Sequence, residues 1–191
     1  MKTLPKTLAP EMNEDTAYAL LGGGCFWCVE AVYQRMKGVI HIESGYAGGH
    51  VKNPPYREIC TKTTGHAEVI LIKYNPQITS YEEILEVFFR THNPTTLNQQ
   101  GNDIGPQYRS VIYYYNEEQK KIAEHVKNNY ASQFWDDPIV TEISEFVNYY
   151  PAEDYHQNYF NNNRLQGYCV FVVKPKVDKF VKEFKDKLRQ E

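Results

Sequence analysis

Two cysteines separated by two residues are the feature of the sequence that most strongly suggests chemistry. Cys25 and Cys28 form the segment C-F-W-C, which follows three glycines at residues 22–24. Glycines allow a tight turn, and a cysteine at a helix start lies near unpaired backbone N–H groups and the positive end of the helix dipole. Both favour a thiolate, so Cys25 is predicted to be a nucleophile at neutral pH. Cys28 lies one turn further along, where it could form a disulfide with Cys25.

Two other interpretations of these cysteines remain open from the residues alone. Cys25 and Cys28 could be small buried hydrophobic residues without any chemistry. A zinc site would need two further ligands, and the spacings of His41, His50 and His66 fit no common zinc module. We therefore predict no metal.

Glu68 is the second candidate, because it begins a predicted strand over residues 67–74. Its neighbours on the same face are Ile70, Ile72 and Tyr74. An acid on an apolar face loses hydration, which raises its pKa and lets it act as a general acid near pH 7. An edge position, where the carboxylate reaches water, fits the periodicity equally well.

Hydrophobic periodicity predicts alternating strands and helices around these residues. The predicted order is a strand at 17–21, a helix from Phe26 to a stop at 37–38, strands at 39–46 and 67–74, a helix behind a capping box of Thr79 and Glu82, and a strand at 109–115. This is the order of the ferredoxin-like β-α-β-β-α-β unit. We expect an α+β fold with a two-layer core, in which helices cover a mixed sheet.

The rest of the chain is predicted to add elements to the same core. These are a helix at 117–133, a strand at 139–146, a short aromatic helix at 152–160, a strand at 168–173 and an amphipathic helix from Lys176, whose lysines form its solvated side. Residues 1–15 are expected to be a flexible N-terminal segment, and residues 16–191 a single catalytic domain.

Composition restricts the function classes. A chain of 191 residues can bury its own core without disulfides. No apolar run approaches the roughly 20 residues of a membrane span, and the first 16 residues hold no apolar signal core, so we expect a cytoplasmic protein without a membrane partner. The 21 basic residues are balanced by 24 acidic ones and form no block, so no nucleic acid is expected either. We expect a monomer.

Seven short segments, taken in order, resemble the motifs of the A-type peptide methionine sulfoxide reductases. They are Gly24-Cys25-Phe26-Trp27, Gly45-Tyr46-Ala47-Gly48-Gly49, Tyr56-Arg57-Glu58, Gly65-His66-Ala67-Glu68, Gly101-Asn102-Asp103, Gln107-Tyr108-Arg109 and Asp154-Tyr155-His156-Gln157. The resemblance extends from about residue 17 to 174. It implies an oxidoreductase for protein repair under oxidative stress, which reduces the S epimer of methionine sulfoxide in proteins and as the free amino acid, without a cofactor.

The resemblance also implies roles for individual residues. Cys25 would be the nucleophile and Glu68 the proton donor to the sulfoxide oxygen, in agreement with the interpretation from the residues themselves. The hydroxyls of Tyr56 and Tyr108 would bind the same oxygen.

Four further residues are implied to bind the substrate. Phe26 and Trp27 would form the apolar walls around the substrate methyl group, whose burial contributes about 1 kcal/mol. Asp103 and His156 would position the substrate backbone and the tyrosines.

After oxygen transfer Cys25 would be a sulfenic acid, which a second thiol can convert to a disulfide. Many family members have glycine where Cys28 stands and use cysteines of a glycine-rich C-terminal tail, which this chain lacks. We favour Cys28 as the resolving thiol over Cys169, and direct attack by an external reductant is the third route. Cys60 is expected to be structural. The resemblance implies thioredoxin as the final reductant.

Two rival functions use the same cysteines. A general thiol–disulfide oxidoreductase would also carry a C-x-x-C pair beside a strand-to-helix turn, but it would need neither Glu68 nor the paired tyrosines. A non-enzymatic module that binds methionine sulfoxide or a metal would leave Cys25 inert, with a pKa near 8.5.

Overall fold

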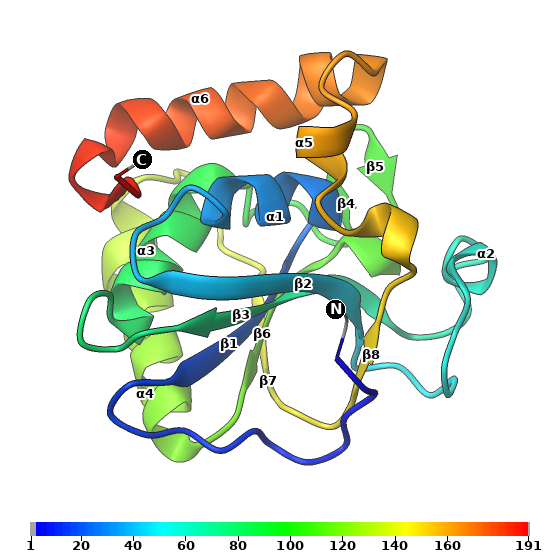
Figure 1. Cartoon of the computed structure of the whole chain (residues 1–191), viewed down its shortest axis with the longest axis horizontal. Coiled ribbons are helices and arrows are strands. Elements are labelled where there is room, and N and C mark those ends of the chain that lie inside the picture. The colour runs from blue at the N-terminus through cyan, green and yellow to red at the C-terminus, as the bar shows by residue number, and fades with distance from the viewer. Residues whose placement is uncertain (1–2, 191) are drawn as a thin grey trace.

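The computed structural model describes residues 3–190, and Figure 1 shows a twisted sheet with helices α1 and α6 stacked over it. The main sheet consists of six strands: β1 (Ala17–Gly23), β2 (Val39–Ala47), β3 (Ala67–Tyr74), β6 (Ser110–Tyr114), β7 (Glu142–Glu145) and β8 (Tyr149–Pro151). A separate small hairpin, which was not predicted, pairs β4 (Gln99–Gln100) with β5 (Asp103–Ile104).

The α-helices cover the sheet and one of its ends. They are α1 (Phe26–Tyr33), α2 (Tyr56–Ile59), α3 (Tyr81–Thr91), α4 (Glu117–His125), α5 (Tyr159–Asn162) and α6 (Lys174–Glu183). Wider π-helical turns (Val126–Tyr130 and Cys169–Val173) and tighter 3-10 turns (Pro106–Tyr108, Ala131–Gln133, Asp154–His156 and Lys185–Lys187) complete the helical structure. Because α4 continues through two of these turns, the helix predicted at 117–133 is confirmed in its extent.

The strand order of the main sheet is β7-β6-β1-β3-β2-β8. The central four strands, β6-β1-β3-β2, are all antiparallel to their neighbours and have the order of the ferredoxin-like unit. Strand β7 pairs with β6 in parallel, which makes the sheet mixed, and β8 pairs with β2. The predicted α+β fold is therefore confirmed.

The strand predicted at residues 168–173 is wrong, because this segment is helical and continues into α6. Local propensity favoured a strand, since the run contains three valines and a phenylalanine. The buried residues nevertheless recur at helical spacing: Cys169, Val173, Val177 and Phe180. Burial of this stripe decides the conformation.

The N-cap of helix α3 lies one residue later than predicted. Ser80, not Thr79, is the N-cap residue, and it accepts a hydrogen bond from the backbone N–H of Glu83 at 3.1 Å. Glu83 in turn accepts one from the Ser80 N–H, so the capping box is Ser80–Glu83 rather than Thr79–Glu82.

Both faces of the sheet are buried. The larger apolar cluster fills the space between the sheet and the helices, while a smaller one on the other face is made of Leu20, Ala47, Ala67, Val69, Leu71, Val111, Tyr113 and Tyr149. The N-terminal segment pairs with β8 through two backbone hydrogen bonds between Lys6 and Tyr149. The predicted flexibility of residues 1–15 stays a prediction, and Met1 and Lys2 lie outside the described residues.

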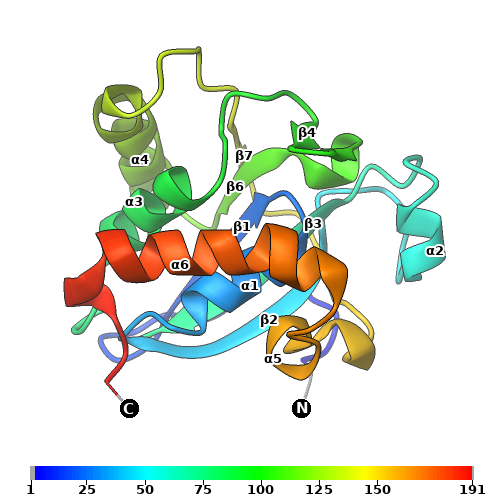
Figure 2. The ribbon, with the colours of Figure 1, turned by 90° about the horizontal axis from the view of Figure 1, so that it is seen from above.

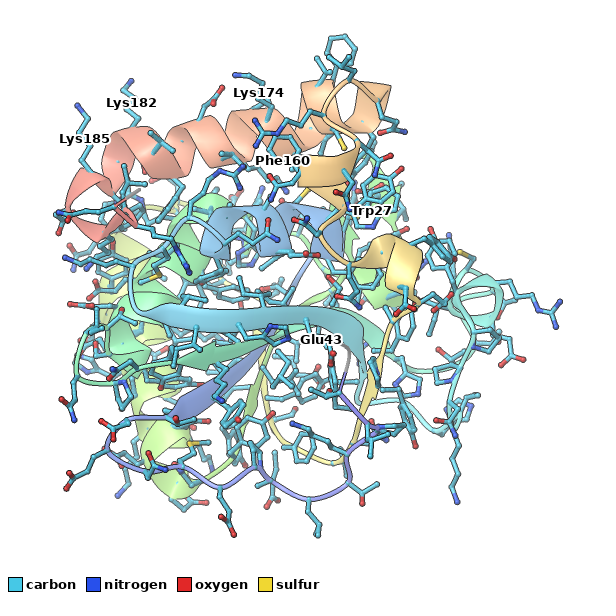
Figure 3. All side chains as sticks on the ribbon, in the orientation of Figure 1. Trp27, Glu43, Phe160, Lys174, Lys182 and Lys185 are labelled. Carbon is cyan, nitrogen blue, oxygen red and sulfur yellow. The ribbon has the colours of Figure 1, made fainter. Side chains whose placement is uncertain are left out.

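The last helix lies across α1, as Figure 2 shows from above. In Figure 3, Lys174 and Lys182 of α6 and Lys185 of the turn after it point away from α1, and all three are exposed. The predicted place on the solvated side is confirmed for Lys182 and Lys185, whereas Lys176 is half-buried. Among residues 3–190, no helix is both long and apolar enough to cross a membrane.

Candidate active site

Cys25 is the N-cap residue of α1 and is buried, with 7% of its surface exposed. The turn before it requires glycine, because Gly24 has φ +90°, and a Cβ there would lie 2.6 Å from the Gln100 side chain. Gln100 holds its own place by two hydrogen bonds to the backbone of Asn93. The predicted glycine turn at the helix start is therefore confirmed, and it fixes the cysteine at the end of β1.

Glu68 lies opposite Tyr46 in the β2–β3 pairing and is only 2% exposed. Its Oε1 accepts a hydrogen bond from the backbone N–H of Phe26 at 3.1 Å, at the start of α1. Burial raises the pKa of Glu68 to about 8, against the opposing effects of the Phe26 N–H and the Cys25 thiol. The buried interpretation of Glu68 is confirmed, and its carboxyl group is mostly protonated at pH 7.

The Cys25 thiol does not have the low pKa expected from its place at a helix start. Burial raises its pKa above the usual value, and the charges of Glu68 and Cys28 add to that effect. The Trp27 N–H and the Tyr168 hydroxyl act in the opposite direction without reversing it. Desolvation thus outweighs the helix dipole, and a neutral thiol lies beside a neutral acid.

The structure brings Tyr56 and Tyr108 together with Glu68. Tyr56 begins α2, and Tyr108 ends the turn Pro106–Tyr108. Burial, followed by the charge of Glu68, raises the pKa of both phenols. Both therefore remain protonated at neutral pH and can donate a hydrogen bond.

Arg109 connects the turn that carries Tyr108 with the turn before strand β3, in which Glu68 lies. Its guanidinium donates to the backbone oxygen of Pro106 at 2.8 Å and to that of Gly65 at 2.9 Å. These bonds fix the turn before Tyr108 against the turn that leads into β3. Arg109 thus positions Tyr108 relative to β3, a role that its place in the motif Gln107-Tyr108-Arg109 did not indicate.

Aromatic rings form one wall of the site. Trp27 stacks on Tyr159 with ring centroids 3.6 Å apart, and its indole N–H donates to Nδ1 of His156 at 3.0 Å. The His156 ring also lies 4.5 Å from the ring of Tyr56 and 5.0 Å from that of Phe26. Burial lowers the pKa of His156 to about 4, so its ring is neutral at pH 7 and can accept the indole proton. Figure 3 places Trp27 at the start of α1, beneath α5.

Asp103 lies at the start of β5, where its carboxylate accepts a hydrogen bond from the Tyr168 hydroxyl at 2.5 Å. The same hydroxyl lies 3.9 Å from the Cys28 sulfur. Sequence reasoning missed Tyr168, although it immediately precedes Cys169. Its only sequence signal was that neighbour, because the contact with Asp103 joins segments 65 residues apart.

The remaining cysteines differ from their expected settings. Cys60 was expected to be structural, but it is exposed, and its thiol influences the pKa of Tyr56 at the rim of the site. Cys169 is buried and lies on a helical turn instead of the predicted strand. Both ring nitrogens of His66 form hydrogen bonds, Nδ1 with the Gly49 N–H and Nε2 with the Val51 carbonyl. Within residues 3–190, no cluster of side chains could hold a metal ion.

A surface groove of 670 Å³ lies at the other end of β2 from Tyr46. Lys37, Gly38, Ile78 and Leu188 are among the residues that line it. None of the residues predicted for the site belongs to its lining. The chemistry-bearing side chains therefore converge elsewhere, at the end of the sheet where α1 begins.

A thiol pair, a buried acid and two phenols define this as the site of a thiol-based oxidoreductase. The sequence model of the family described as peptide methionine sulfoxide reductase matches residues 17–188. The chain is 54% identical over 171 residues to the peptide methionine sulfoxide reductase MsrA of Saccharolobus solfataricus, covering 90% of this chain and 96% of that one. It is 56% identical over 164 residues to the protein of the same name from Leptospira borgpetersenii, covering 86% and 93% of the two chains. The chain belongs to the peptide methionine sulfoxide reductase family, and the prediction made from its motifs is confirmed.

Solved structures agree with this fold. The reduced form of Mxr1 from Saccharomyces cerevisiae superposes with a TM-score of 0.75 at 32% identity, over 81% of this chain and 90% of that one. Methionine sulfoxide reductase A of Corynebacterium diphtheriae gives 0.71 at 35% identity, over 81% and 78%. Mxr1 in complex with Trx2 gives 0.54 at 24% identity, over 79% and 89%, which supports the fold alone.

Proposed function

We infer that this enzyme reduces the S epimer of methionine sulfoxide with Cys25 as nucleophile and Glu68 as acid. The observation that carries this assignment is the buried Glu68 carboxyl group, which the Phe26 N–H holds at the start of α1, next to the buried Cys25. A sulfoxide sulfur becomes electrophilic when its oxygen is protonated, and an acid with a pKa of about 8 still holds that proton at pH 7.

The first step needs no preformed thiolate. As the Cys25 sulfur attacks the sulfoxide sulfur, Glu68 gives its proton to the sulfoxide oxygen and accepts the thiol proton in exchange. The attack forms a bond between the Cys25 sulfur and the substrate sulfur. This bond and the substrate S–O bond then break as the hydroxyl group passes to the Cys25 sulfur, and methionine leaves. Cys25 becomes a sulfenic acid and Glu68 is protonated again, so atoms and protons balance.

Two phenols support the charge that develops on the oxygen. Tyr56 and Tyr108 remain protonated, and both are close enough to Glu68 for its charge to raise their pKa values. Each can donate a hydrogen bond to the oxygen that Glu68 protonates. Phe26 and Trp27 supply the apolar surface for the substrate methyl group, while His156 holds the indole through its hydrogen bond.

The sulfenic acid is then resolved by Cys28. The two thiols interact strongly enough for the charge of Cys28 to raise the pKa of Cys25, and the Cys28 N–H donates to the Cys25 carbonyl at 3.1 Å. Cys169 is the alternative, since both Cys169 and Cys25 influence the pKa of Tyr159. Cys28 is favoured because it lies within the same first turn of α1 as the sulfenic acid.

Thioredoxin is the proposed reductant of the resulting disulfide, in keeping with the yeast relative that has been solved in complex with Trx2. The proposed substrates are methionine S-sulfoxide in proteins and as the free amino acid. A monomeric, cytoplasmic enzyme whose residues 16–191 form one catalytic domain stays a prediction.

One experiment tests both the reaction and the resolving thiol. Purified protein is mixed with one equivalent of methionine S-sulfoxide without reductant, and methionine, thiols and disulfides are measured. We expect one methionine per chain, the loss of two thiols and a Cys25–Cys28 disulfide. A Cys25–Cys169 disulfide would contradict the choice of Cys28 alone. No methionine, with four intact thiols, would contradict the assignment of Cys25 and Glu68 and leave general thiol–disulfide exchange as the function to test.

A further inference from the structure

The surroundings of Cys28 differ from those of an inert buried thiol. Cys28 is 1% exposed, and burial raises its pKa. Two neighbours act in the opposite direction: the positive charge of Lys176 at the start of α6 and the hydroxyl of Tyr168. The carboxyl groups of Asp103 and Glu68 raise the pKa of Cys28 further, and the Cys25 thiol is a fifth titratable neighbour of this sulfur.

The hydrogen bond from Tyr168 to Asp103 sets the direction in which a proton can move from Cys28. The phenol donates its own proton to the Asp103 carboxylate at 2.5 Å, which leaves lone pairs on its oxygen. That oxygen lies 3.9 Å from the Cys28 sulfur, within the range of a hydrogen bond to sulfur, and can accept the S–H proton. Burial, together with the charges of Cys25, Cys28 and Asp103, raises the pKa of Tyr168, so a free phenolate is disfavoured. Because a neutral phenol holds one proton, a proton that arrives from Cys28 requires the phenol to give its own proton to Asp103 at the same time.

We propose that Tyr168 and Asp103 form a proton relay that activates Cys28 when it resolves the Cys25 sulfenic acid, an inference that rests on the proposed function. As the Cys28 sulfur attacks the Cys25 sulfur, the S–H proton moves to the Tyr168 oxygen, and the Tyr168 proton moves to Asp103.

The remaining bonds and charges balance around this transfer. The S–S bond forms while the S–O bond of the sulfenic acid breaks, so the Cys28 sulfur is oxidised and the Cys25 sulfur is reduced. The oxygen leaves as hydroxide and takes a proton from Glu68 to become water. The proton on Asp103 then returns to Glu68 through solvent, and one disulfide and one water are formed.

This relay gives Asp103 a role different from the predicted binding of the substrate backbone. It also explains why Tyr168 is held between a carboxylate and two thiols. The phenol carries a proton only in the second step, because Glu68 and Cys25 exchange the protons of the first step between themselves.

The test separates the two steps in time. Enzyme and one equivalent of methionine S-sulfoxide are mixed rapidly without reductant, and methionine, sulfenic acid and remaining thiols are measured in quenched samples. In Tyr168→Phe, which keeps the ring packed edge-on against Trp27, we expect methionine formation to slow by no more than a few-fold, because the hydroxyl affects the pKa of Cys25 but carries no proton in that step. Disulfide formation should slow by about 10- to 100-fold, with the sulfenic acid accumulating.

Further variants show how the rate of disulfide formation depends on each group of the relay. Cys28→Ser should leave the sulfenic acid unresolved, and Tyr130→Phe, which loses a hydroxyl beside Arg90, should behave as wild type. Asp103→Asn should slow the disulfide step as Tyr168→Phe does, and the double variant should be no slower than the slower single one. In Tyr168→Phe the rate of disulfide formation should rise steeply with pH, because Cys28 must then lose its proton to solvent; a packing defect would not produce that profile.

Two results would overturn the relay. One is a Tyr168→Phe protein that forms the disulfide at the wild-type rate, and the other is a loss confined to methionine formation. Failure of the wild-type protein to make methionine would instead contradict the proposed function, so the two inferences fail separately.

Discussion

The carboxyl group of Glu68 and the backbone N–H of Phe26 are joined by a hydrogen bond of 3.1 Å, which connects the start of the central strand β3 to the first turn of α1. This bond aligns the acid with the thiol one residue earlier. It also explains why the carboxyl pKa is raised only to about 8, because the N–H partly offsets the burial.

The first prediction concerns the pH dependence of oxygen transfer. Because the pKa of Glu68 is raised to about 8, its acidic form is present at neutral pH and is lost as the pH rises through 8. The single-turnover rate of methionine formation should fall above that pH. Glu68→Gln should lower the rate by about 10²-fold or more and abolish the fall. Glu145→Gln, on the exposed end of β7, is the matched control, and full activity in Glu68→Gln would refute the role of the acid.

The second prediction concerns the two phenols. Tyr56→Phe and Tyr108→Phe should each lower kcat by about 10²-fold, because each removes one hydrogen-bond donor from the developing charge. KM should change less, since the rings remain in place. Tyr114→Phe, whose ring lies near the Lys120 ammonium rather than Glu68, should leave both constants unchanged. Equal losses in all three variants would indicate a general effect on folding.

The third prediction concerns the aromatic wall. His156→Ala removes the acceptor for the Trp27 indole, a net loss of about 1 kcal/mol, and the ring that packs against Tyr56. We expect KM for methionine S-sulfoxide to rise by roughly fivefold, with a smaller change in kcat. His125→Ala, on the exposed surface of α4, is the control. A fall in kcat alone would place His156 in the chemical step instead.

The fourth prediction concerns stability, through a second buried acid, Glu30 on α1. Burial raises the pKa of Glu30 to about 7, although the Ser44 hydroxyl and the Asn158 N–H donate to its carboxylate. A raised pKa stabilises the fold fully below the unfolded value of 4.5, and this contribution is lost as the pH rises through 7.

Denaturant titrations at pH 5 and pH 8 measure this effect. Between them the wild-type protein should lose about 3 kcal/mol more of its free energy of unfolding than Glu30→Gln does. The control is Glu145→Gln, because Glu145 is exposed. Glu83→Gln is not suitable, since Glu83 is part of the capping box of α3. An identical pH dependence in Glu30→Gln and wild type would show that Glu30 titrates normally.

The elements that could be predicted from the sequence are those in which local and tertiary preferences agree. Strand β3 is a short apolar run that is buried on both faces, helix α3 has a clear period of 3.6, and the glycine turn before Cys25 has a single steric explanation. Residues 168–173 were misassigned because valines favour strands locally, while the stripe from Cys169 to Phe180 is buried as a helix. Only packing against α1 resolves that conflict.

The site was predictable for a different reason, since its motifs are short and contiguous. Glu68 could be singled out by its apolar strand neighbours, and Cys25 by its turn. Tyr168 could not, because its partner Asp103 reaches it only through the folded arrangement of the β4–β5 hairpin and the segment before α6. The pKa of Cys25 was misjudged for the same reason, since the depth of burial is a tertiary property.

The separation of Cys25 and Cys28 by two residues has a kinetic consequence in the proposed cycle. A thiol held within the same helical turn has a high effective concentration, because almost no chain entropy opposes the encounter. Capture of the sulfenic acid then competes favourably with a second oxidation to the irreversible sulfinic acid. The short spacing thus protects an enzyme that must work where oxidants are abundant from being inactivated by them.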